Sequence, residues 1–333
     1  MSAAVLAVDG GNSKTDVALV AADGTLLAAV RGPTTSHQAV GLEPGIQRLV
    51  GLVEQAATMA GLDPSVRPMS TIGVHAAAGA DFPSDVRLIE GGLRRARLSE
   101  EDVVVNDCLG ALWSGASEGW GIVLICGEGV NGAAVAPNGR TVRFDGIGSL
   151  SGDWGGGGAV GLAGLAAAVR ARDGRGSRTA LETLVPAHFG LKRPSAVTRA
   201  MYDRRIDEDR VGELSPVVFG AATDGDAVAR EIVDRLADEL ATMATALARR
   251  LGLTRRTVEV VLAGGVFQTD DEPFIERLGA RIRAAVPGAT LVRPDVPPVA
   301  GAALEGLERL GLDPDERRAA RARLREGMRG WRP

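Results

Sequence analysis

The sequence predicts an α/β protein built from two related domains, and three observations lead to this prediction. Its 333 residues, 45% of them hydrophobic, are enough for about two domain cores. Short apolar strands alternate along the chain with segments of helical periodicity, as in α/β domains. One order of elements occurs twice: strand, glycine-rich loop, strand, Asx-Gly turn, strand. Hairpins are common, but the similar order and loop chemistry favour a duplication over chance.

The first copy begins with a strand at Val5–Val8 and continues, after a glycine loop, with strands on both sides of the Asp23-Gly24 turn. Pro44–Ala60 has apolar residues at helical spacing, with a proline at its start and Gly61 just past its end. The elements expected next are a strand at Thr71–Ala76, a helix at Ser84–Leu98, a strand at Val103–Val105 and a helical run at Leu109–Ser114.

The second copy begins with a strand at Ile122–Cys126, followed by the loop Gly127–Gly132 and two strands around the Asn138-Gly139 turn. The elements expected after it are helices at 159–172 and 226–251, a strand at 257–262, a helix at 272–286, a strand at 289–292 and a helix at 299–310. The last segment, Asp315–Arg329, is so highly charged that we expect a helix exposed to solvent.

Composition excludes several classes of protein. Lys and Arg total 38 and Asp and Glu total 42, so the net charge is −4, which disfavours nucleic acid and anionic membranes as partners. No apolar run approaches the ~20 residues of a membrane span, and the N-terminus lacks a basic signal-peptide region. Cys108 and Cys126 cannot form a disulfide framework. We therefore expect a cytoplasmic protein.

Two glycine loops are candidates for binding phosphate. In Asp9–Thr15, the glycines let backbone N–H groups approach an anion, Lys14 adds positive charge, and Asp9 can hold magnesium through water. The spacing of a P-loop is absent, and alone this loop could be an ordinary hairpin turn. The second loop, Gly127–Gly132, favours a polyphosphate held between two domains. Gly264-Gly265 could lie against a base or ribose, or simply start a helix.

Three further polar positions are candidates for chemistry. Asp107 directly follows a buried strand, where a carboxylate can act as a general base or cap the next helix. Asp153 lies in a loop rich in glycine and could orient a ligand or form a turn. His37 lies in a polar loop that could contact a substrate, whereas His75 falls on a strand and is expected in the core. No Ser/His/Asp arrangement is recognised, which argues against a serine hydrolase, and no GxGxxG follows the first strand, which argues against a dinucleotide-binding unit at that position.

Taken in order, these motifs resemble those of the actin-like sugar kinase superfamily. Asp9–Thr15, Val105-Asn106-Asp107, Gly127–Gly132, Gly152-Asp153 and Ala263–Val266 follow one another as in the BadF/BadG-type ATPase family, in particular its N-acetylglucosamine kinase branch. The resemblance runs to about Leu312. It implies two RNase-H-like domains, residues 1–116 and 117–312, around a central nucleotide cleft, with residues 313–333 packing back on the first. It also implies a homodimer that uses ATP and Mg²⁺.

The resemblance also implies a role for each matching residue. Asp107 would be the base that deprotonates the 6-hydroxyl of an amino sugar, most simply N-acetylglucosamine, while Asp9 would hold magnesium. The nucleotide would contact Gly10, Gly11, Asn12, Ser13, Lys14, Thr15, Gly127, Gly129, Asn131, Gly264 and Gly265. The sugar would contact Ser36, His37, Glu128 and Asp153.

Departures from the family pattern leave the acceptor open. The second loop has Glu128 and Val130 where the family has Thr and Ser, so Glu128 is expected to face the sugar or a magnesium ion. Trp154 replaces a glutamate, and Ser36-His37 replaces Asn followed by His or Trp. Glucosamine and N-acetylmannosamine are alternative acceptors. An ATPase that activates a partner enzyme would need cysteines for a bridging cluster, and a sugar sensor would lack Asp9 or Asp107.

Overall fold

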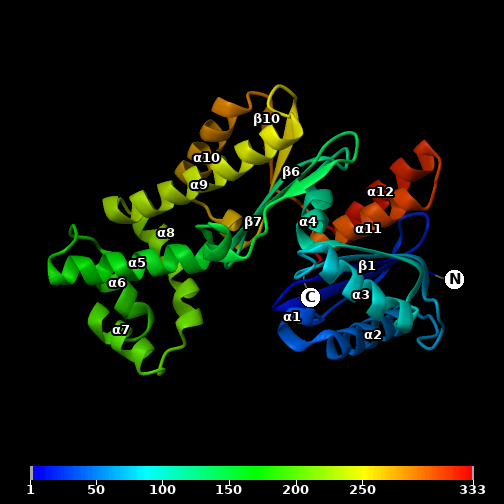
Figure 1. The fold of residues 1–333 in the computed structure, drawn as a ribbon, viewed down its shortest axis with the longest axis horizontal. Coiled ribbons are helices and arrows are strands. Elements are labelled where there is room, and N and C mark those ends of the chain that lie inside the picture. The colour runs from blue at the N-terminus through cyan, green and yellow to red at the C-terminus, as the bar shows by residue number, and fades with distance from the viewer. Residues whose placement is uncertain (1–2, 332–333) are drawn as a thin grey trace. The chain divides into compact units, whose positions relative to one another are not determined.

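The computed structural model of the protein describes residues 3–331, in which two five-stranded mixed sheets are flanked by helices (Figure 1). The first sheet has the order β3-β2-β1-β4-β5 and the second the order β10-β9-β6-β7-β8. If the strands of the second sheet are renumbered so that β6 is the first strand of its copy, their order read from β8 to β10 matches the order of the first sheet from β3 to β5. The shared order confirms the duplicated α/β fold. The strands are β1 Ala3–Gly10, β2 Lys14–Val20, β3 Leu26–Pro33, β4 Ser70–Ala77, β5 Ser99–Asn106, β6 Gly121–Cys126, β7 Val130–Val135, β8 Thr141–Arg143, β9 Val258–Ala263 and β10 Ala289–Val292.

The chain forms two compact units, one up to residue 123 together with residues from 292 onward, the other from 124 to 291. The helices of the first unit are α1 His37–Val40, α2 Leu42–Met59, α3 Pro83–Ala96, α4 Asp107–Gly115, α11 Pro298–Arg309 and α12 Pro314–Met328. Those of the second are α5 Gly156–Asp173, α6 Leu181–His188, α7 Pro194–Tyr202, α8 Ser215–Thr223, α9 Ala227–Leu251 and α10 Glu272–Ala285.

Strand pairing in the first sheet brings the polar ends of three strands to one edge. β1 pairs antiparallel with β2 but parallel with β4, and β4 pairs parallel with β5. Asp9 is level with Ala76, which is level with Val105. Because parallel strands end at the same edge, Asp9 and Asp107 share the carboxyl edge of this sheet.

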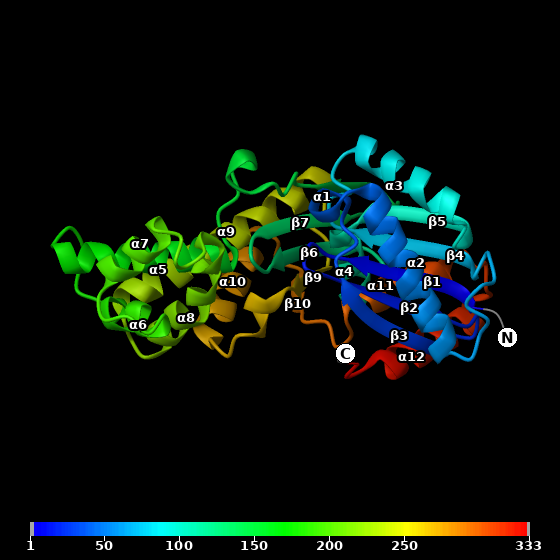
Figure 2. The ribbon, with the colours of Figure 1, turned by 90° about the horizontal axis from the view of Figure 1, so that it is seen from below.

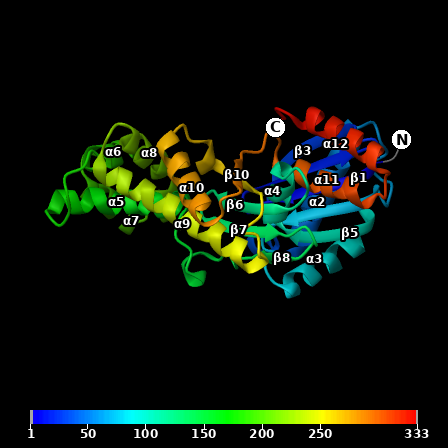
Figure 3. The ribbon, with the colours of Figure 1, turned by 90° about the horizontal axis from the view of Figure 1, so that it is seen from above.

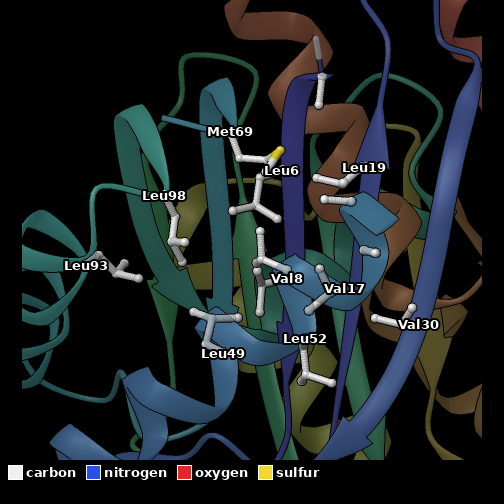
Figure 4. Packing of buried hydrophobic residues seen from close by; sticks show 14 of the residues in the cluster. Leu6, Val8, Val17, Leu19, Val30, Leu49, Leu52, Met69, Leu93 and Leu98 are labelled. Atoms are coloured by element: carbon white, nitrogen blue, oxygen red, sulfur yellow. The ribbon is translucent and has the colours of Figure 1, made fainter. Parts of the chain in front are cut away.

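Both faces of the first sheet are covered by helices (Figure 2). Leu6 and Val8 of β1 pack beneath α2 and α3, and Figure 4 shows Val8 near Leu49 and Leu52 and Leu6 near Met69. Successive side chains of a strand point to opposite faces, so Val5 and Ala7 pack against α11 and α12 instead. The loops at the ends of these strands are therefore connected to a sheet that has a hydrophobic core on each face.

The two C-terminal helices complete the first unit (Figure 3). The charge of the last helix predicted exposure to solvent, and this is wrong for one face: Ala320, Leu324 and Met328 are fully buried in the core beside β1, on the domain where the resemblance implied that residues 313–333 pack. The sequence also placed α11 with the second domain. In the structure α11 packs on β1 and α4, where Gly301 lies so close to the backbone of Gly110 that a side chain would overlap it.

Three helices of the second unit, α6, α7 and α8, were not predicted, because residues 181–223 mix short apolar runs with prolines and glycines. The long helix α9 lies beside α10 in this unit (Figures 1 and 3). Within residues 3–331, no helix is both long and apolar enough to cross a membrane.

We expect Leu324→Ala to destabilise the first unit by about 2–5 kcal/mol, because the fully buried side chain leaves a cavity between α12 and the sheet. Arg318→Ala, on the exposed face of the same helix, should change stability by less than about 0.5 kcal/mol. Urea unfolding followed by circular dichroism measures both. Equal effects of the two substitutions would contradict the packing of α12.

Candidate active site

The turn from β1 to β2 has the geometry expected of an anion-binding loop. The N–H of Gly11 donates to the carbonyl of Lys14 at 2.9 Å, which closes the turn. The side chains of Asn12, Ser13 and Lys14 are exposed at its tip. These three side chains are therefore accessible from solvent, and their contact with a phosphate stays a prediction.

Thr15 has a different environment from the rest of this loop. It is fully buried, and its hydroxyl accepts a hydrogen bond from the N–H of Thr35 and contacts the Thr35 hydroxyl, both at 3.0 Å. Next to it, the Thr34 hydroxyl donates to the carbonyl of Gly11 at 2.7 Å and accepts from the N–H of Ser36 at 3.0 Å. The phosphate loop and the loop of Ser36 are thus hydrogen-bonded to each other, with Thr15 as an anchor.

Asp9 carries an unfavourable charge at the carboxyl edge of the sheet. Burial, followed by repulsion from Asp107 and from Asp16, raises its pKa from 3.8 to about 7, although Lys14 and Arg31 act in the opposite direction. The position therefore favours a neutral carboxyl or a bound cation. The effect of Asp107 on Asp9 also shows that the first unit brings these two predicted residues into electrostatic contact.

The sequence analysis missed the ion pair that supports this edge. Asp16 is 1% exposed and accepts two hydrogen bonds from Arg31, at 2.6 Å from Nε and 2.7 Å from Nη2. The two residues face each other in the β2–β3 register. Counting outward from the Asp23-Gly24 turn would have predicted this cross-strand pair.

The structure separates the two roles considered for Asp107. Its neighbour Asn106 is the N-cap of α4 and accepts from the N–H of Cys108 at 3.2 Å, so capping by the side chain is the function of Asn106. The Asn106 amide also donates to Asp81 at 3.0 Å, and Asp81 accepts a second bond from Gln38 at 3.3 Å. Asp81 thus links α1 to the start of α4. The sequence analysis missed Asp81, although it follows a strand at the same edge.

Ser36 and His37 lie above a small cavity. The cavity measures about 40 Å³, and Gly10 and His75 also line it. Ser36 Oγ and His37 Nδ1 are buried and have no hydrogen-bond partner within residues 3–331. His75 is buried, as predicted, and its Nε2 lies 2.9 Å from Asp102 Oδ1. The loop therefore holds two buried polar atoms that have no hydrogen-bond partner among the described residues.

In the second unit, the loop at Gly127 is closed by the start of α5. The N–H of Gly157 donates to the carbonyl of Gly127 at 2.7 Å, and that of Gly158 donates to the carbonyl of Glu128 at 3.0 Å. Gly156 has a φ of +78° and lies so close to Gly129 that only glycine fits. Glycine at 156 is thus required by the close approach of helix and loop.

Glu128, Gly127 and Gly265 line a cavity of about 680 Å³ in this unit. Helix α8 contributes Pro216 and Phe219 to its wall. Gly264 has a φ of +105° and lies against the carbonyl of Cys126, so the strand ends of β6 and β9 approach closely. The predicted adenosine and second phosphate positions are therefore neighbours of one cavity.

Asn131 and Asp153 are not among the residues that line this cavity. The Asn131 side chain accepts from the N–H of Gly132 at 2.7 Å. Asp153 accepts a short hydrogen bond from Ser151, and the guanidinium of Arg235 lies 3.8 Å from the ring centre of Trp154. Both polar side chains thus have local partners that hold their loops.

We expect Asp9→Asn to stabilise the protein at pH 8 in metal-free buffer. The folded state binds the Asp9 proton more tightly than the unfolded state, so stability falls as the pH rises from about 4 to about 7. The upper bound of the gain is about 4 kcal/mol. Thermal unfolding at several pH values, with exposed Asp315→Asn as control, should show a gain that shrinks towards pH 4; a gain independent of pH would contradict this account.

Comparison with known proteins agrees with this arrangement. An N-acetylmuramic acid/N-acetylglucosamine kinase of Clostridium acetobutylicum is 30% identical over 266 residues, which is 79% of this chain and 85% of that protein. An N-acetyl-D-glucosamine kinase of Dictyostelium discoideum is 25% identical over 315 residues, 91% of this chain and 97% of that protein.

A solved structure shares the fold. A candidate N-acetylglucosamine kinase from Chromobacterium violaceum superposes with a TM-score of 0.71 at 24% identity, over 92% of this chain and 99% of that one. Residues 6–306 match the BadF/BadG/BcrA/BcrD ATPase family. The chain is therefore a member of the BadF/BadG/BcrA/BcrD ATPase family.

Proposed function

We propose that this protein is a kinase that transfers the γ-phosphoryl group of ATP to the 6-hydroxyl of an amino sugar, with N-acetylglucosamine as the first candidate. The observation that carries the proposal is the position of Asp107 at the carboxyl edge of a parallel sheet, close enough to Asp9 to raise its pKa. The names of the two relatives support a 2-acetamido sugar as the acceptor.

Asp107 acts as the general base in this proposal. As the sugar hydroxyl oxygen forms its bond to the γ-phosphorus, the bond from that phosphorus to the β–γ bridging oxygen breaks and ADP leaves. The hydroxyl proton passes to the Asp107 carboxylate. Asn106 directly precedes the base, and its hydrogen bond to Asp81 fixes the end of the strand. Asn106 also caps the helix that begins at Asp107, so the backbone that carries the base is held from both sides.

The charges around Asp9 fit a magnesium ion held through water. Burial, and after it repulsion from Asp107 and Asp16, raises the pKa of Asp9, and no group of three His, Cys, Asp or Glu side chains within residues 3–331 could hold a metal directly. Mg²⁺ typically keeps several waters and uses one or two carboxylates together with substrate phosphates. When bound, it would neutralise the phosphate oxygens during transfer.

The 680 Å³ cavity of the second unit fits the nucleoside of ATP. Pro216, Phe219 and Val266 provide apolar surface for a base, and Gly265 leaves room against the backbone. In the first unit, we propose that the loop of Ser36 and His37, whose buried Oγ and Nδ1 have no partner among the described residues, rearranges to expose these atoms to the sugar. Because the Clostridium relative is named for two 2-acetamido sugars, both belong in the test of the acceptor.

The activator function is less consistent with the cysteines. Burial raises the pKa of the Cys126 thiol to about 12, which disfavours the thiolate that an iron–sulfur cluster requires. Cys108 is also fully buried. This observation favours sugar phosphorylation over cluster-dependent activation.

We expect ADP release from ATP and magnesium to depend on N-acetylglucosamine, and Asp107→Asn to lower kcat by about 10²–10⁴-fold with a smaller change in KM. The amide cannot accept the proton, although it preserves the shape of the side chain. A coupled ADP assay over a panel of amino sugars, including N-acetylmuramic acid, measures both effects.

Asp315→Asn, on the exposed face of α12, is the matched control and should retain full turnover. ATP hydrolysis that needs no sugar would refute the proposed reaction. Turnover that survives Asp107→Asn would refute the proposed base.

A further inference from the structure

We propose that Glu128 recognises the ribose of the nucleotide, so that the protein discriminates ribonucleotides from deoxyribonucleotides. The inference rests on the proposed function, because it takes the 680 Å³ cavity of the second unit as the nucleoside site. It departs from the expectation that Glu128 faces the sugar or a magnesium ion.

The Glu128 carboxylate lies against two glycines of the cavity wall. A methyl group at Gly158 would lie 2.6 Å from Oε1, and one at Gly212 would overlap Oε2. The two glycines, one in α5 and one in the 3₁₀ turn Glu208–Leu214, therefore leave a space that the carboxylate fills. Gly157 and Gly212 line the same cavity as Glu128, so the carboxylate lies at the cavity wall.

The charges of the cavity favour a nucleoside over a phosphate chain. No Lys or Arg is among its lining residues within the described chain, whereas Glu128, Asp224, Asp270 and Asp271 all line it. Phosphate oxygens beside these carboxylates would be repelled at short range. Neutral groups that donate hydrogen bonds, such as ribose hydroxyls and base amines, suit this lining.

Among the four carboxylates, Glu128 is the one that is confined by glycines and also unpartnered. None of the hydrogen bonds or ion pairs within residues 3–331 uses its side chain. Asp271, in contrast, accepts from Arg230 at 2.8 and 3.0 Å and caps α10 through the N–H of Phe274.

An ionised carboxylate only accepts hydrogen bonds, and its two oxygens match a pair of adjacent hydroxyls. The 2′- and 3′-hydroxyls of ribose are such a pair, and a carboxylate partner for them is also how dinucleotide sites recognise ribose. Glu128 thus places an accessible acceptor pair at the wall of the nucleoside cavity.

Calorimetric titration of the full chain with ADP and with 2′-deoxy-ADP tests the inference without a sugar or turnover. We expect the wild type to bind ADP about 10–100-fold more tightly than 2′-deoxy-ADP, as for a charge-assisted hydrogen bond. E128Q should reduce this ratio to less than about 3-fold. Its affinity for 2′-deoxy-ADP should not fall, because the substitution also removes a negative charge near the phosphates.

E128D separates geometry from charge, because it keeps the carboxylate but shortens the side chain that carries it. We expect E128D to lose the preference for ADP over 2′-deoxy-ADP as well. D224N removes an equal charge from the same cavity and should keep the ratio. Thermal unfolding of each variant checks that it is folded.

Equal binding of the two nucleotides by the wild type would overturn the inference while leaving the kinase intact. Loss of the ratio in D224N, or a changed magnesium requirement for ADP binding in E128Q with the ratio unchanged, would also overturn it. Failure of the wild type to bind either nucleotide would count against the proposed function itself, and with it the inference.

Discussion

The parallel pairing of β1 with β4 and of β4 with β5 is the constraint on which the first unit depends. It brings Asp9, Asp81 and Asp107 to one edge of a sheet that is buried on both faces. Negative charge concentrated there is costly, and the raised pKa of Asp9 is the sign of that cost. The positive charges of Lys14 and Arg31, on the neighbouring hairpin, offset part of it, whereas Asp16 adds to it.

The same edge couples two loops that have different tasks in the proposed reaction. Thr15 and Thr35 are hydrogen-bonded, and Thr34 bonds the backbone of the phosphate loop. A displacement of the phosphate loop would therefore strain the segment that carries Ser36 and His37. Such a connection lets the occupancy of one loop influence the order of the other.

Much of the architecture could be predicted because it depends on local patterns. The repeated order of strands, glycine loops and Asx-Gly turns indicated the duplication, and the position of Asp107 after a strand indicated the sheet edge. Hydrogen-bonded pairs that are far apart in the sequence leave no local pattern, so the bond between Asp81 and Asn106 was not predicted. The charge of α12 predicted a helix exposed to solvent, because its three buried apolar residues lie among many charged ones; only the resemblance implied that this segment packs back on the first domain. The position of Glu128 depends on glycines at 158 and 212, which no local pattern connects to it.

The discontinuity of the first unit has a consequence during synthesis. The strands that include β1 leave the ribosome early, but α11 and α12, which cover one face of their sheet, are made only after residues 124–291. At typical bacterial or eukaryotic elongation rates, this interval is on the order of ten seconds. Val5, Ala7 and Val74 on that face stay uncovered in the meantime. The nascent chain is thus a candidate client for chaperones that bind exposed apolar strands, until its own last helices take their place.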